Sequence, residues 1–359
     1  MNVLYLINYA GSGGSERYVE LLARYYHNSK ASCGLCYNVD GPLVEKLKAL
    51  GIPVHQLPMR NPLDLAAAKA LAELVRREGY DVIHAQYPRE NYIAILAKLF
   101  GCKAKVVFTS HLISEQPAVW RLMNRVFTPR NHAVLTVCTY GREVLERGGV
   151  AKDKIRIVFN GVDAAAAPKR DRSILKEFGI GDEEKVITIL TRFSGEKGVP
   201  FLLRSIAKLK KKTTVPFRLL LVGTGPDFDR DKSLVPELGI EDRVVLTGFR
   251  SDTAALLAAS DIYLNSSSSE AMSFAILEAL GAGLPLVLTD VGGNPELVNT
   301  GAVCGLLVPY GDEEAYAAAI ARLLEDDALR ARYAAAARAK AEREFGLYNL
   351  LDELYKIYQ

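Results

Sequence analysis

The sequence alternates short apolar runs with amphipathic stretches, and this alternation limits the possible folds more than any other feature. Residues 3–7 form a continuous apolar run, as expected for a strand that is buried on both faces of a parallel sheet. Residues 42–50 and 63–78 have helical periodicity. Because parallel strands need a crossover connection, the pattern predicts an α/β protein whose helices cover a parallel sheet.

The same rhythm starts again in the second half of the chain. Three predicted strands there each end in a loop that contains glycine: 186–190, 218–222 and 244–247. Residues 164–170 are small or polar and lack apolar periodicity, which is typical of a domain boundary. A chain of 359 residues has room for two cores. We therefore predict three parts: an N-terminal domain at 1–163, a C-terminal domain at 164–343, and a terminal amphipathic helix in 344–359.

Two glutamates, Glu270 and Glu278, flank the apolar run of residues 271–277. The periodicity predicts a helix from Ser273 that stops at Gly281, with Glu270 in the preceding loop. A rise of ~1.5 Å per residue separates the carboxylates by about 10 Å, roughly the length of a sugar diphosphate. Backbone N–H groups at the helix start suit a pyrophosphate, and the carboxylates suit sugar and ribose hydroxyls. Alternatively, Glu270 caps the helix and Glu278 is a solvated surface residue.

Other strand ends carry groups that could bind phosphate. A glycine-rich turn at 11–14 joins the first strand to the first helix, where backbone N–H groups can approach a ligand closely. Glu16 occupies the third glycine position of the dinucleotide fingerprint, which argues against a hydride-transfer enzyme. Arg192 and Lys197 share one strand-end loop and could pair with phosphate oxygens. His111, at the end of another strand, is a site candidate.

Several patterns remain open between a functional and a structural interpretation. His84, also at a strand end, competes with His111 as the functional histidine. Cys33 and Cys36 have metal-site spacing but lie in a predicted strand, where residues three apart face opposite sides. Asp229 and Asp231 resemble a metal-binding pair but fall in a predicted surface helix. We expect neither pair to hold a metal.

Charge and hydropathy bear on partners and location. Residues 1–160 hold 21 Lys and Arg against 13 Asp and Glu, a net +8, whereas the remainder holds 24 against 29, a net −5. The basic half suggests an anionic partner, and a solvated surface bias is the alternative. Residues 120–127 could contact a membrane surface, or could be an ordinary packed helix. Neither a signal-peptide pattern nor a long apolar run is found, which predicts a cytoplasmic protein that could associate with a membrane.

Taken in order along nearly the whole chain, these motifs resemble the retaining glycosyltransferases of the GT-B fold, specifically family 4. The matching motifs are Gly13 to Arg17, Ser110 with His111, Asn160 to Asp163, Arg192 with Lys197 and Gly198, Gly223 to Pro226, Gly248 with Phe249, Glu270 with Glu278, and Gly292 to Glu296. Thr191 and Ala271 stand where the family usually has glycine, which bears on the shape of the sugar pocket.

The resemblance implies an α/β protein with two Rossmann-like domains facing across a cleft, and a terminal helix that crosses back to the first domain. Arg192 and Lys197 would hold the donor diphosphate, Glu270 would bind sugar hydroxyls, and His111 would contact sugar or acceptor. The donor would also meet ribose-binding Glu278, base-binding Gly248 and Phe249, and the further positions Gly13, Gly14, Asn160, Gly223, Ala271, Met272, Ser273 and Phe274.

The implied activity is retaining transfer of a hexose or N-acetylhexosamine from a nucleotide sugar to a hydroxyl of a glycan, lipid-linked or small-molecule acceptor. UDP-sugars are favoured and GDP-mannose is second. No metal or other cofactor, no protein nucleophile and no nucleic-acid partner are expected. Three alternatives use the same fold: a nucleotide-sugar epimerase, a phosphorylase, which would need a pyridoxal phosphate lysine, and a non-catalytic nucleotide-sugar-binding subunit.

Overall fold

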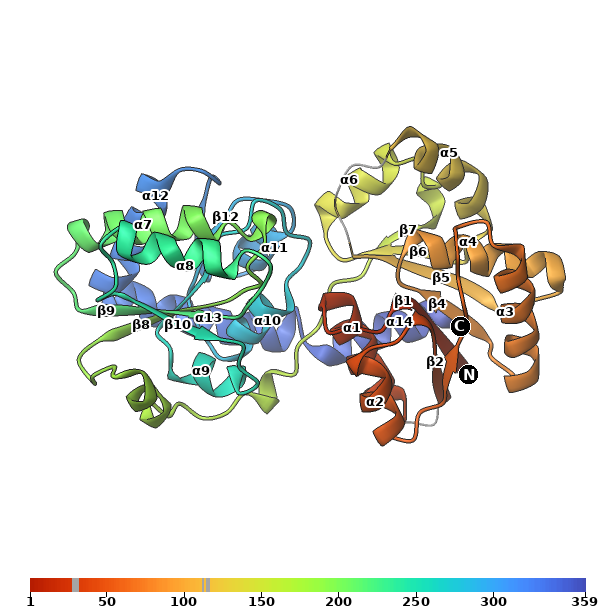
Figure 1. Ribbon diagram of the computed structural model, residues 1–359, viewed down its shortest axis with the longest axis horizontal. Coiled ribbons are helices and arrows are strands. Elements are labelled where there is room, and N and C mark those ends of the chain that lie inside the picture. The colour runs from red at the N-terminus through yellow and green to blue at the C-terminus, as the bar shows by residue number, and fades with distance from the viewer. Residues whose placement is uncertain (28–31, 112, 114–116) are drawn as a thin grey trace. The chain divides into compact units, whose positions relative to one another are not determined.

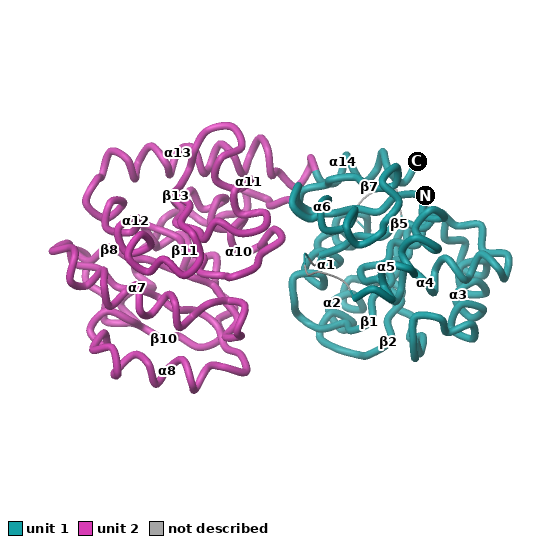
Figure 2. Tube along the Cα trace, turned by 90° about the horizontal axis from the view of Figure 1, so that it is seen from above, with its two compact units in different colours: residues 1–160, 350–359 teal, residues 161–349 magenta. Residues whose placement is uncertain are grey.

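A computed structural model of the chain describes residues 1–27, 32–111, 113 and 117–359 (Figure 1). The chain divides into two compact units. Unit 1 comprises Met1–Asn160 and Leu350–Gln359, and unit 2 comprises Gly161–Asn349 (Figure 2). Each unit is built on its own parallel sheet with helices on both faces, so the predicted α/β class is confirmed.

Within the described residues, unit 1 contains a seven-stranded parallel sheet with the order β3-β2-β1-β4-β5-β6-β7. The strands are β1 (Asn2–Tyr9), β2 (Ser32–Val39), β3 (Val54–Gln56), β4 (Val82–Ala85), β5 (Lys105–Ser110), β6 (Ala133–Thr136) and β7 (Ile155–Ile157). The helices are α1 (Gly14–His27), α2 (Pro42–Ala49), α3 (Leu65–Glu78), α4 (Pro88–Ala97), α5 (Ala118–Phe127), α6 (Thr139–Arg147) and the larger part of α14 (Leu347–Tyr358). The strand order reverses between β1 and β4, the point at which open α/β sheets bind ligands.

Strand alternation divides the side chains of unit 1 between two cores. Leu4 and Leu6 of β1 join an apolar cluster with residues of α3 and α4. Tyr5 points to the opposite face, where its ring packs against His84 of β4. The His84 ring also contacts Tyr358 of α14, so the end of the chain is part of this second core. Successive strand residues face opposite sides, and this is why one strand supplies both cores.

Cys33 and Cys36 lie in β2, as predicted, and both are buried. Burial raises the pKa of the Cys33 thiol to about 11 and that of the Cys36 thiol to about 12. Both side chains are therefore protonated at neutral pH and act as small apolar core residues.

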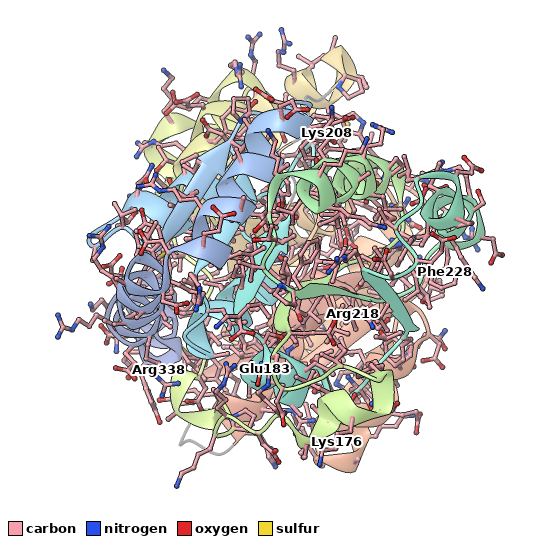
Figure 3. All side chains as sticks on the ribbon, turned by 90° about the vertical axis from the view of Figure 1, so that its left-hand side faces the viewer. Lys176, Glu183, Lys208, Arg218, Phe228 and Arg338 are labelled. Atoms are coloured by element: carbon pink, nitrogen blue, oxygen red, sulfur yellow. The ribbon has the colours of Figure 1, made fainter. Side chains whose placement is uncertain are left out.

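Unit 2 contains a six-stranded parallel sheet, within the described residues, with the order β10-β9-β8-β11-β12-β13. The strands are β8 (Lys185–Leu190), β9 (Phe217–Val222), β10 (Val244–Gly248), β11 (Ile262–Asn265), β12 (Leu286–Thr289) and β13 (Gly305–Val308). The helices are α7 (Val199–Lys212), α8 (Phe228–Glu237), α9 (Thr253–Ala259), α10 (Phe274–Gly281), α11 (Asn294–Asn299), α12 (Glu313–Glu325) and α13 (Asp327–Arg343). Among the labelled charged side chains, Lys208 of α7 pairs with Glu314 of α12, and Arg338 of α13 donates to the Gly281 carbonyl of α10 (Figure 3).

The alanine-rich residues 312–343 form two helices, α12 and α13, because the chain breaks at Asp326. Asp326 has an extended backbone, with φ −105° and ψ 91°, and its carboxylate accepts a hydrogen bond from the backbone N–H of Leu329 at 2.8 Å. It thus caps α13 and ends the path of α12. Alanine-rich composition conceals such a break, since only one residue signals the cap.

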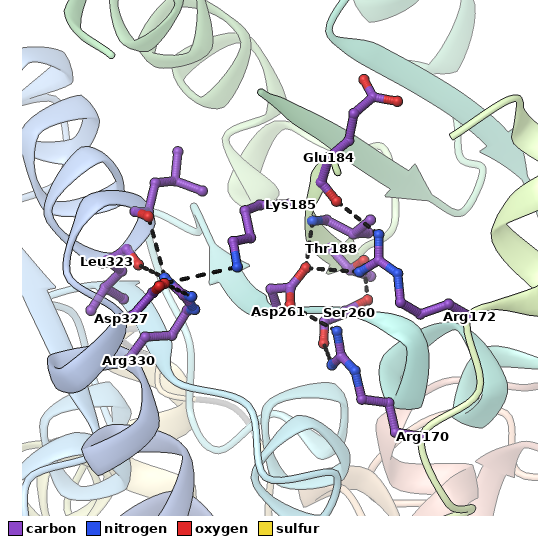
Figure 4. Close-up of polar contacts among 12 residues, drawn as sticks. Arg170, Arg172, Glu184, Lys185, Thr188, Ser260, Asp261, Leu323, Asp327 and Arg330 are labelled. Atoms are coloured by element: carbon purple, nitrogen blue, oxygen red, sulfur yellow. Dashed lines mark hydrogen bonds and ion pairs between the residues drawn. The ribbon is translucent and has the colours of Figure 1, made fainter. Parts of the chain in front are cut away.

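The amino edge of the unit 2 sheet anchors the segment that leads into the unit (Figure 4). Arg170 donates to Asp261 Oδ1 at 2.8 Å and to the Ser260 carbonyl at 2.6 Å, and Arg172 donates to Asp261 Oδ2 at 3.2 Å. A cavity of about 330 Å³ lies beside them and is also lined by Arg330, which donates to two carbonyls at the end of α12. These arginines are bound within the protein, so we assign this edge a structural role.

Candidate functional site

An ion pair between Lys197 and Glu270 lies beyond the carboxyl ends of β8 and β11. Lys197 Nζ is 2.8 Å from Glu270 Oε2, although the residues are 73 positions apart in the sequence. The Lys197 side chain is 24% exposed and the Glu270 side chain is 11% exposed. The pair therefore has less solvent screening than a surface salt bridge, yet its cation can still be approached by a ligand.

Polar neighbours hold the Glu270 side chain and backbone in place. Its carboxylate accepts hydrogen bonds from Ser267 Oγ at 3.1 Å and from Asn265 Nδ2 at 3.5 Å. The Gly293 N–H donates to the Glu270 carbonyl at 3.0 Å. Asn294, which is fully buried, donates from Nδ2 to Asn265 Oδ1 at 3.1 Å. A carboxylate with these partners keeps one orientation, as a group that recognises hydroxyls must.

Backbone contacts fix the Lys197 loop against the loop that follows β11. Ser266 Oγ donates to the Lys197 carbonyl at 2.8 Å, and the Ser268 N–H donates to the Glu196 carbonyl at 2.8 Å. Gly198 has a φ of 63°, and a Cβ atom there would collide with the Ser266 carbonyl. Only glycine allows this close approach in the left-handed region, so the glycine after Lys197 sets the position of the lysine.

Three strand-end loops meet near Arg192. The Thr191 N–H donates to the Val222 carbonyl at 2.9 Å, and the Gly223 N–H donates to the Gly248 carbonyl at 2.9 Å. Arg192 itself is exposed on the first loop. The structure thus brings the loops of Arg192, Gly223 and Gly248 together, as expected for strand ends of one parallel sheet.

Phe249 directly follows Gly248 and is 76% exposed. An exposed aromatic ring at a strand end gives a flat apolar face, which is the kind of surface on which a nucleobase can stack.

Helix α10 begins at Phe274 and includes Gly281, so Glu270 lies in the preceding loop and Glu278 within the helix, as predicted. Ser273 is the N-cap residue, and its side chain makes no capping hydrogen bond in the described structure. The backbone N–H groups of the first turn therefore keep the partial positive charge of a helix start. Of the preceding positions, Ala271 is half-buried and Met272 is buried.

On unit 1, His111 follows β5 at the carboxyl edge of the sheet. Its Nε2 lies 2.9 Å from Gln86 Oε1, and its ring lies 5.0 Å from the ring of Tyr18. Burial lowers the pKa of His111 to about 4, so the imidazole is neutral at pH 7. His111 can therefore exchange hydrogen bonds with a hydroxyl but does not supply a positive charge.

The rival His84 points into the core. Its ring nitrogens bond Tyr358 and Thr109, each at 2.6 Å, and it is fully buried. Burial, followed by the effect of His111, lowers the pKa of His84 to about 3. We assign His84 a structural role and keep His111 as the site candidate.

The remaining predicted positions of unit 1 follow strands β1 and β7 of its sheet. Gly13 precedes α1 and Gly14 is its first residue, so both belong to the turn after β1. The next residue, Ser15, is buried and shares a 2.6 Å hydrogen bond with the Tyr87 hydroxyl. Asn160 is buried and is the last residue of the first segment of unit 1.

Sequence reasoning missed the residues that support the candidates. Gln86, Asn265 and Ser267 each follow or end a strand at a carboxyl edge, which was the available signal. Asn294 lies in a motif that was noticed without a role. Asp229 and Asp231 lie in a helix, as predicted, in the first turn of α8. Asp231 is buried rather than on the surface, and its Oδ1 accepts a hydrogen bond from Arg230 Nη2 at 2.8 Å.

Comparison with known proteins gives this geometry a family. Residues 12–166 match the family described as glycosyltransferase family 4, and residues 171–340 match that described as glycosyl transferases group 1. The N-acetyl-alpha-D-glucosaminyl L-malate synthase of Bacillus anthracis is 34% identical over 315 residues, which cover 85% of this chain and 80% of that protein. The chain belongs to the family 4 glycosyltransferases of group 1. It is therefore an enzyme that transfers sugar from an activated donor.

More distant relatives extend the likeness to nearly the full length. A UDP-Gal:alpha-D-GlcNAc-diphosphoundecaprenol alpha-1,3-galactosyltransferase of Escherichia coli is 24% identical over 349 residues, covering 92% of this chain and 89% of that protein. The crystal structure of Anabaena Alr3699/HepE in complex with UDP-glucose has a TM-score of 0.86 at 23% identity, covering 99% of this chain and 98% of that chain. This chain therefore adopts the predicted GT-B fold with two Rossmann-like domains.

Proposed function

We propose that this glycosyltransferase moves a hexose or N-acetylhexosamine from a UDP-sugar to a hydroxyl of a glycan, lipid-linked or small-molecule acceptor, with retention of configuration and without a metal. The observation that carries the proposal is the Lys197–Glu270 pair, which is held at a strand-end edge beside the loop of Arg192. The names of two relatives support this donor class, because one is named for an N-acetylglucosaminyl group and the other for UDP-Gal.

The donor half of the reaction follows from the charges at this edge. When the bond between the anomeric carbon and the phosphate oxygen breaks, the electron pair stays on the departing UDP. Arg192, Lys197 and the start of α10 are groups that stabilise such developing negative charge. The positive charges of Arg192 and Lys197, together with the start of α10, can replace the charge that a divalent ion provides in other sugar transferases.

Retention requires the acceptor hydroxyl to approach the face that UDP leaves. In our proposal the acceptor oxygen bonds to the anomeric carbon, and its proton passes to a phosphate oxygen of the leaving group. Glu270 accepts hydrogen bonds from sugar hydroxyls and so orients the ring, because its own partners keep the carboxylate in place. Glu278 is proposed to bind the ribose hydroxyls.

Unit 1 is proposed to bind the acceptor. Its net charge of +8 over residues 1–160 favours an acceptor that carries phosphate or carboxylate. The Bacillus anthracis relative is named for malate and the Escherichia coli relative for a diphosphoundecaprenol, and both acceptors are anionic. His111 supplies a neutral hydrogen-bonding ring at the carboxyl edge of the unit 1 sheet.

A donor panel and product analysis test this proposal. UDP-, GDP- and ADP-sugars would be compared by thermal shift, followed by mass spectrometry and NMR of products formed with malate and with a polyprenyl diphosphate sugar. We expect a UDP-sugar, with UDP-N-acetylglucosamine tested first, to give the largest shift and an α-linked product. A β-linked product, or preference for GDP-sugars, would contradict the proposal. Epimerised donor in the absence of acceptor would indicate the epimerase instead.

Helix α5 is the proposed contact with an anionic membrane. Trp120 packs inward, 5.7 Å from the ring of Tyr92, whereas Val119, Leu122 and Val126 are 61%, 63% and 50% exposed along one stripe. Arg121 and Arg125 flank the stripe and are also exposed. Apolar side chains flanked by arginine are typical of helices that lie in a lipid interface. Across the described residues, every helix is too short or too polar to cross a bilayer.

Sedimentation with lipid vesicles tests this contact. We expect the protein to bind vesicles that contain phosphatidylglycerol and to bind phosphatidylcholine vesicles weakly. Leu122→Glu should abolish binding, whereas Leu65→Glu changes a similarly exposed leucine of α3 and should not. Equal binding by both variants would exclude α5 as the contact.

A further inference from the structure

We propose that Gln86 is a positioning residue that determines which ring nitrogen of His111 carries the proton, so that Nδ1 accepts a hydrogen bond from a substrate hydroxyl. The inference rests on the proposed contact between His111 and sugar or acceptor. It adds a residue that no motif of the sequence identified.

The orientation of the Gln86 amide is decided by its other partner. Gln86 Nε2 donates to the backbone carbonyl of His84 at 3.0 Å. A carbonyl oxygen can only accept, so the NH₂ group must face His84 and the amide oxygen must face His111. That oxygen is the atom 2.9 Å from His111 Nε2.

The tautomer of His111 follows from this orientation. An amide oxygen has no proton to donate, so His111 Nε2 must carry the hydrogen of the 2.9 Å contact. A neutral imidazole has one protonated and one unprotonated nitrogen, which makes Nδ1 the acceptor. A sugar or acceptor hydroxyl would then donate to Nδ1. The opposite tautomer would place two acceptors against each other at the Gln86 contact.

The surroundings of Gln86 make this arrangement rigid. Gln86 is fully buried, and its N–H donates to the carbonyl of Leu6 in β1 at 3.1 Å. Gln86 therefore lies between β1 and β4, where the strand order reverses. The Tyr18 ring packs edge-on against His111 at 5.0 Å and against His84 at 6.0 Å, which also limits rotation of the His111 ring.

The rings around His111 bring no charge that would change this assignment near neutral pH. Tyr18 comes from α1, and burial holds its pKa well above the usual range for tyrosine. His84 comes from β4, and burial keeps it neutral by lowering its pKa to about 3. The protonation of His111 Nε2 is therefore left to its partner Gln86.

The test measures the tautomer directly and separately from turnover. Nitrogen NMR of histidine-labelled full-length protein, assigned with a His111→Gln spectrum, should show Nε2 protonated and Nδ1 unprotonated in the wild type at pH 7. Gln86→Leu should mix the tautomers and lower kcat on the order of 10-fold with a smaller change in KM, as expected for loss of one hydrogen bond. Gln86→Glu keeps an acceptor oxygen toward His111, so Nε2 should stay protonated, but its carboxylate cannot donate to the His84 carbonyl and kcat should recover only in part.

Tyr358→Phe is the matched control, because it removes a buried hydrogen bond to His84 and leaves the Gln86–His111 contact intact. It should retain the wild-type tautomer even if stability falls. A wild-type His111 protonated at Nδ1, or an unchanged tautomer in Gln86→Leu, would overturn the inference. Because the NMR readout needs no substrate, it decides this question even if the proposed transfer reaction is not found.

Discussion

Replacing Lys197 by alanine should lower both turnover and stability, and the two effects can be predicted separately. Lys197 lies 2.8 Å from Glu270, with side chains that are 24% and 11% exposed. The pair is more buried than a surface ion pair and less buried than a fully buried one. Surface ion pairs are worth ~0–1 kcal/mol, and disruption of a fully buried pair costs ~3–5 kcal/mol. Glu270 retains its bonds to Ser267 and Asn265 in the variant. We therefore expect a loss of about 1–2 kcal/mol in the free energy of unfolding.

The kinetic effect should be larger. If Lys197 stabilises the charge that develops on the leaving diphosphate, its loss should reduce kcat by roughly 10²- to 10³-fold, as for other electrostatic stabilisers. The assay is release of UDP under saturating donor and acceptor, combined with urea unfolding of the same preparations. Lys208→Ala is the matched control, since Lys208 pairs with Glu314 at 2.9 Å on the outer face of α7 and should leave kcat unchanged (Figure 3).

A double-mutant cycle separates a direct role of Lys197 from a supporting one. If Lys197 only positions Glu270, the double variant Lys197→Ala/Glu270→Ala should turn over as slowly as Glu270→Ala alone. If Lys197 also contacts the diphosphate, the double variant should be slower than Glu270→Ala by at least about 10-fold. Near-normal kcat in Lys197→Ala would refute the electrostatic reasoning altogether.

Further predictions concern the support of the site, pH and metal. Asn294→Ala removes two buried hydrogen bonds, from Nδ2 to Asn265 Oδ1 and to the Thr289 carbonyl, and should cost about 1–3 kcal/mol, seen as a lower urea midpoint; an unchanged midpoint would argue against this role. Gly198→Ala should reduce kcat because the added Cβ displaces the Lys197 loop, and wild-type kcat would contradict that loop geometry. Burial lowers the pKa of His84 to about 3, so the unfolded chain binds a proton at His84 more readily than the folded protein does. The contribution of neutral His84 to the free energy of unfolding is therefore complete above about pH 6.5 and is lost as the pH falls toward 3. In urea unfolding, His84→Gln should therefore lose less stability than wild type between pH 7 and 5, whereas replacement of the exposed His27 by glutamine should match wild type. An equal change in unfolding free energy with pH for all three proteins would exclude His84 as the cause. Activity should persist in EDTA. Loss of activity in EDTA that only a divalent ion restores would contradict the metal-free mechanism.

Hydrophobic periodicity was enough to predict the local framework of this enzyme. The alternation of apolar runs with helical patterns predicted two parallel sheets, and the period around Glu270 and Glu278 placed one carboxylate in a loop and the other in a helix. Such patterns are local, because whether a side chain is buried depends mainly on the pitch of its own helix or strand. The break between α12 and α13 at Asp326 was not predicted, because a single capping residue does not change the hydrophobic periodicity.

The pairing of side chains was decided only by the tertiary structure. Lys197 and Glu270 meet because β8 and β11 are neighbours in the sheet, although 73 residues separate them. Tyr358 reaches His84 across 274 residues because α14 packs on the sheet of unit 1. Sequence periodicity shows that each group lies at a strand end or on a helix face. Which groups touch depends on strand order, register and the close approach of backbones at glycines such as Gly198, and these follow from packing of the whole unit.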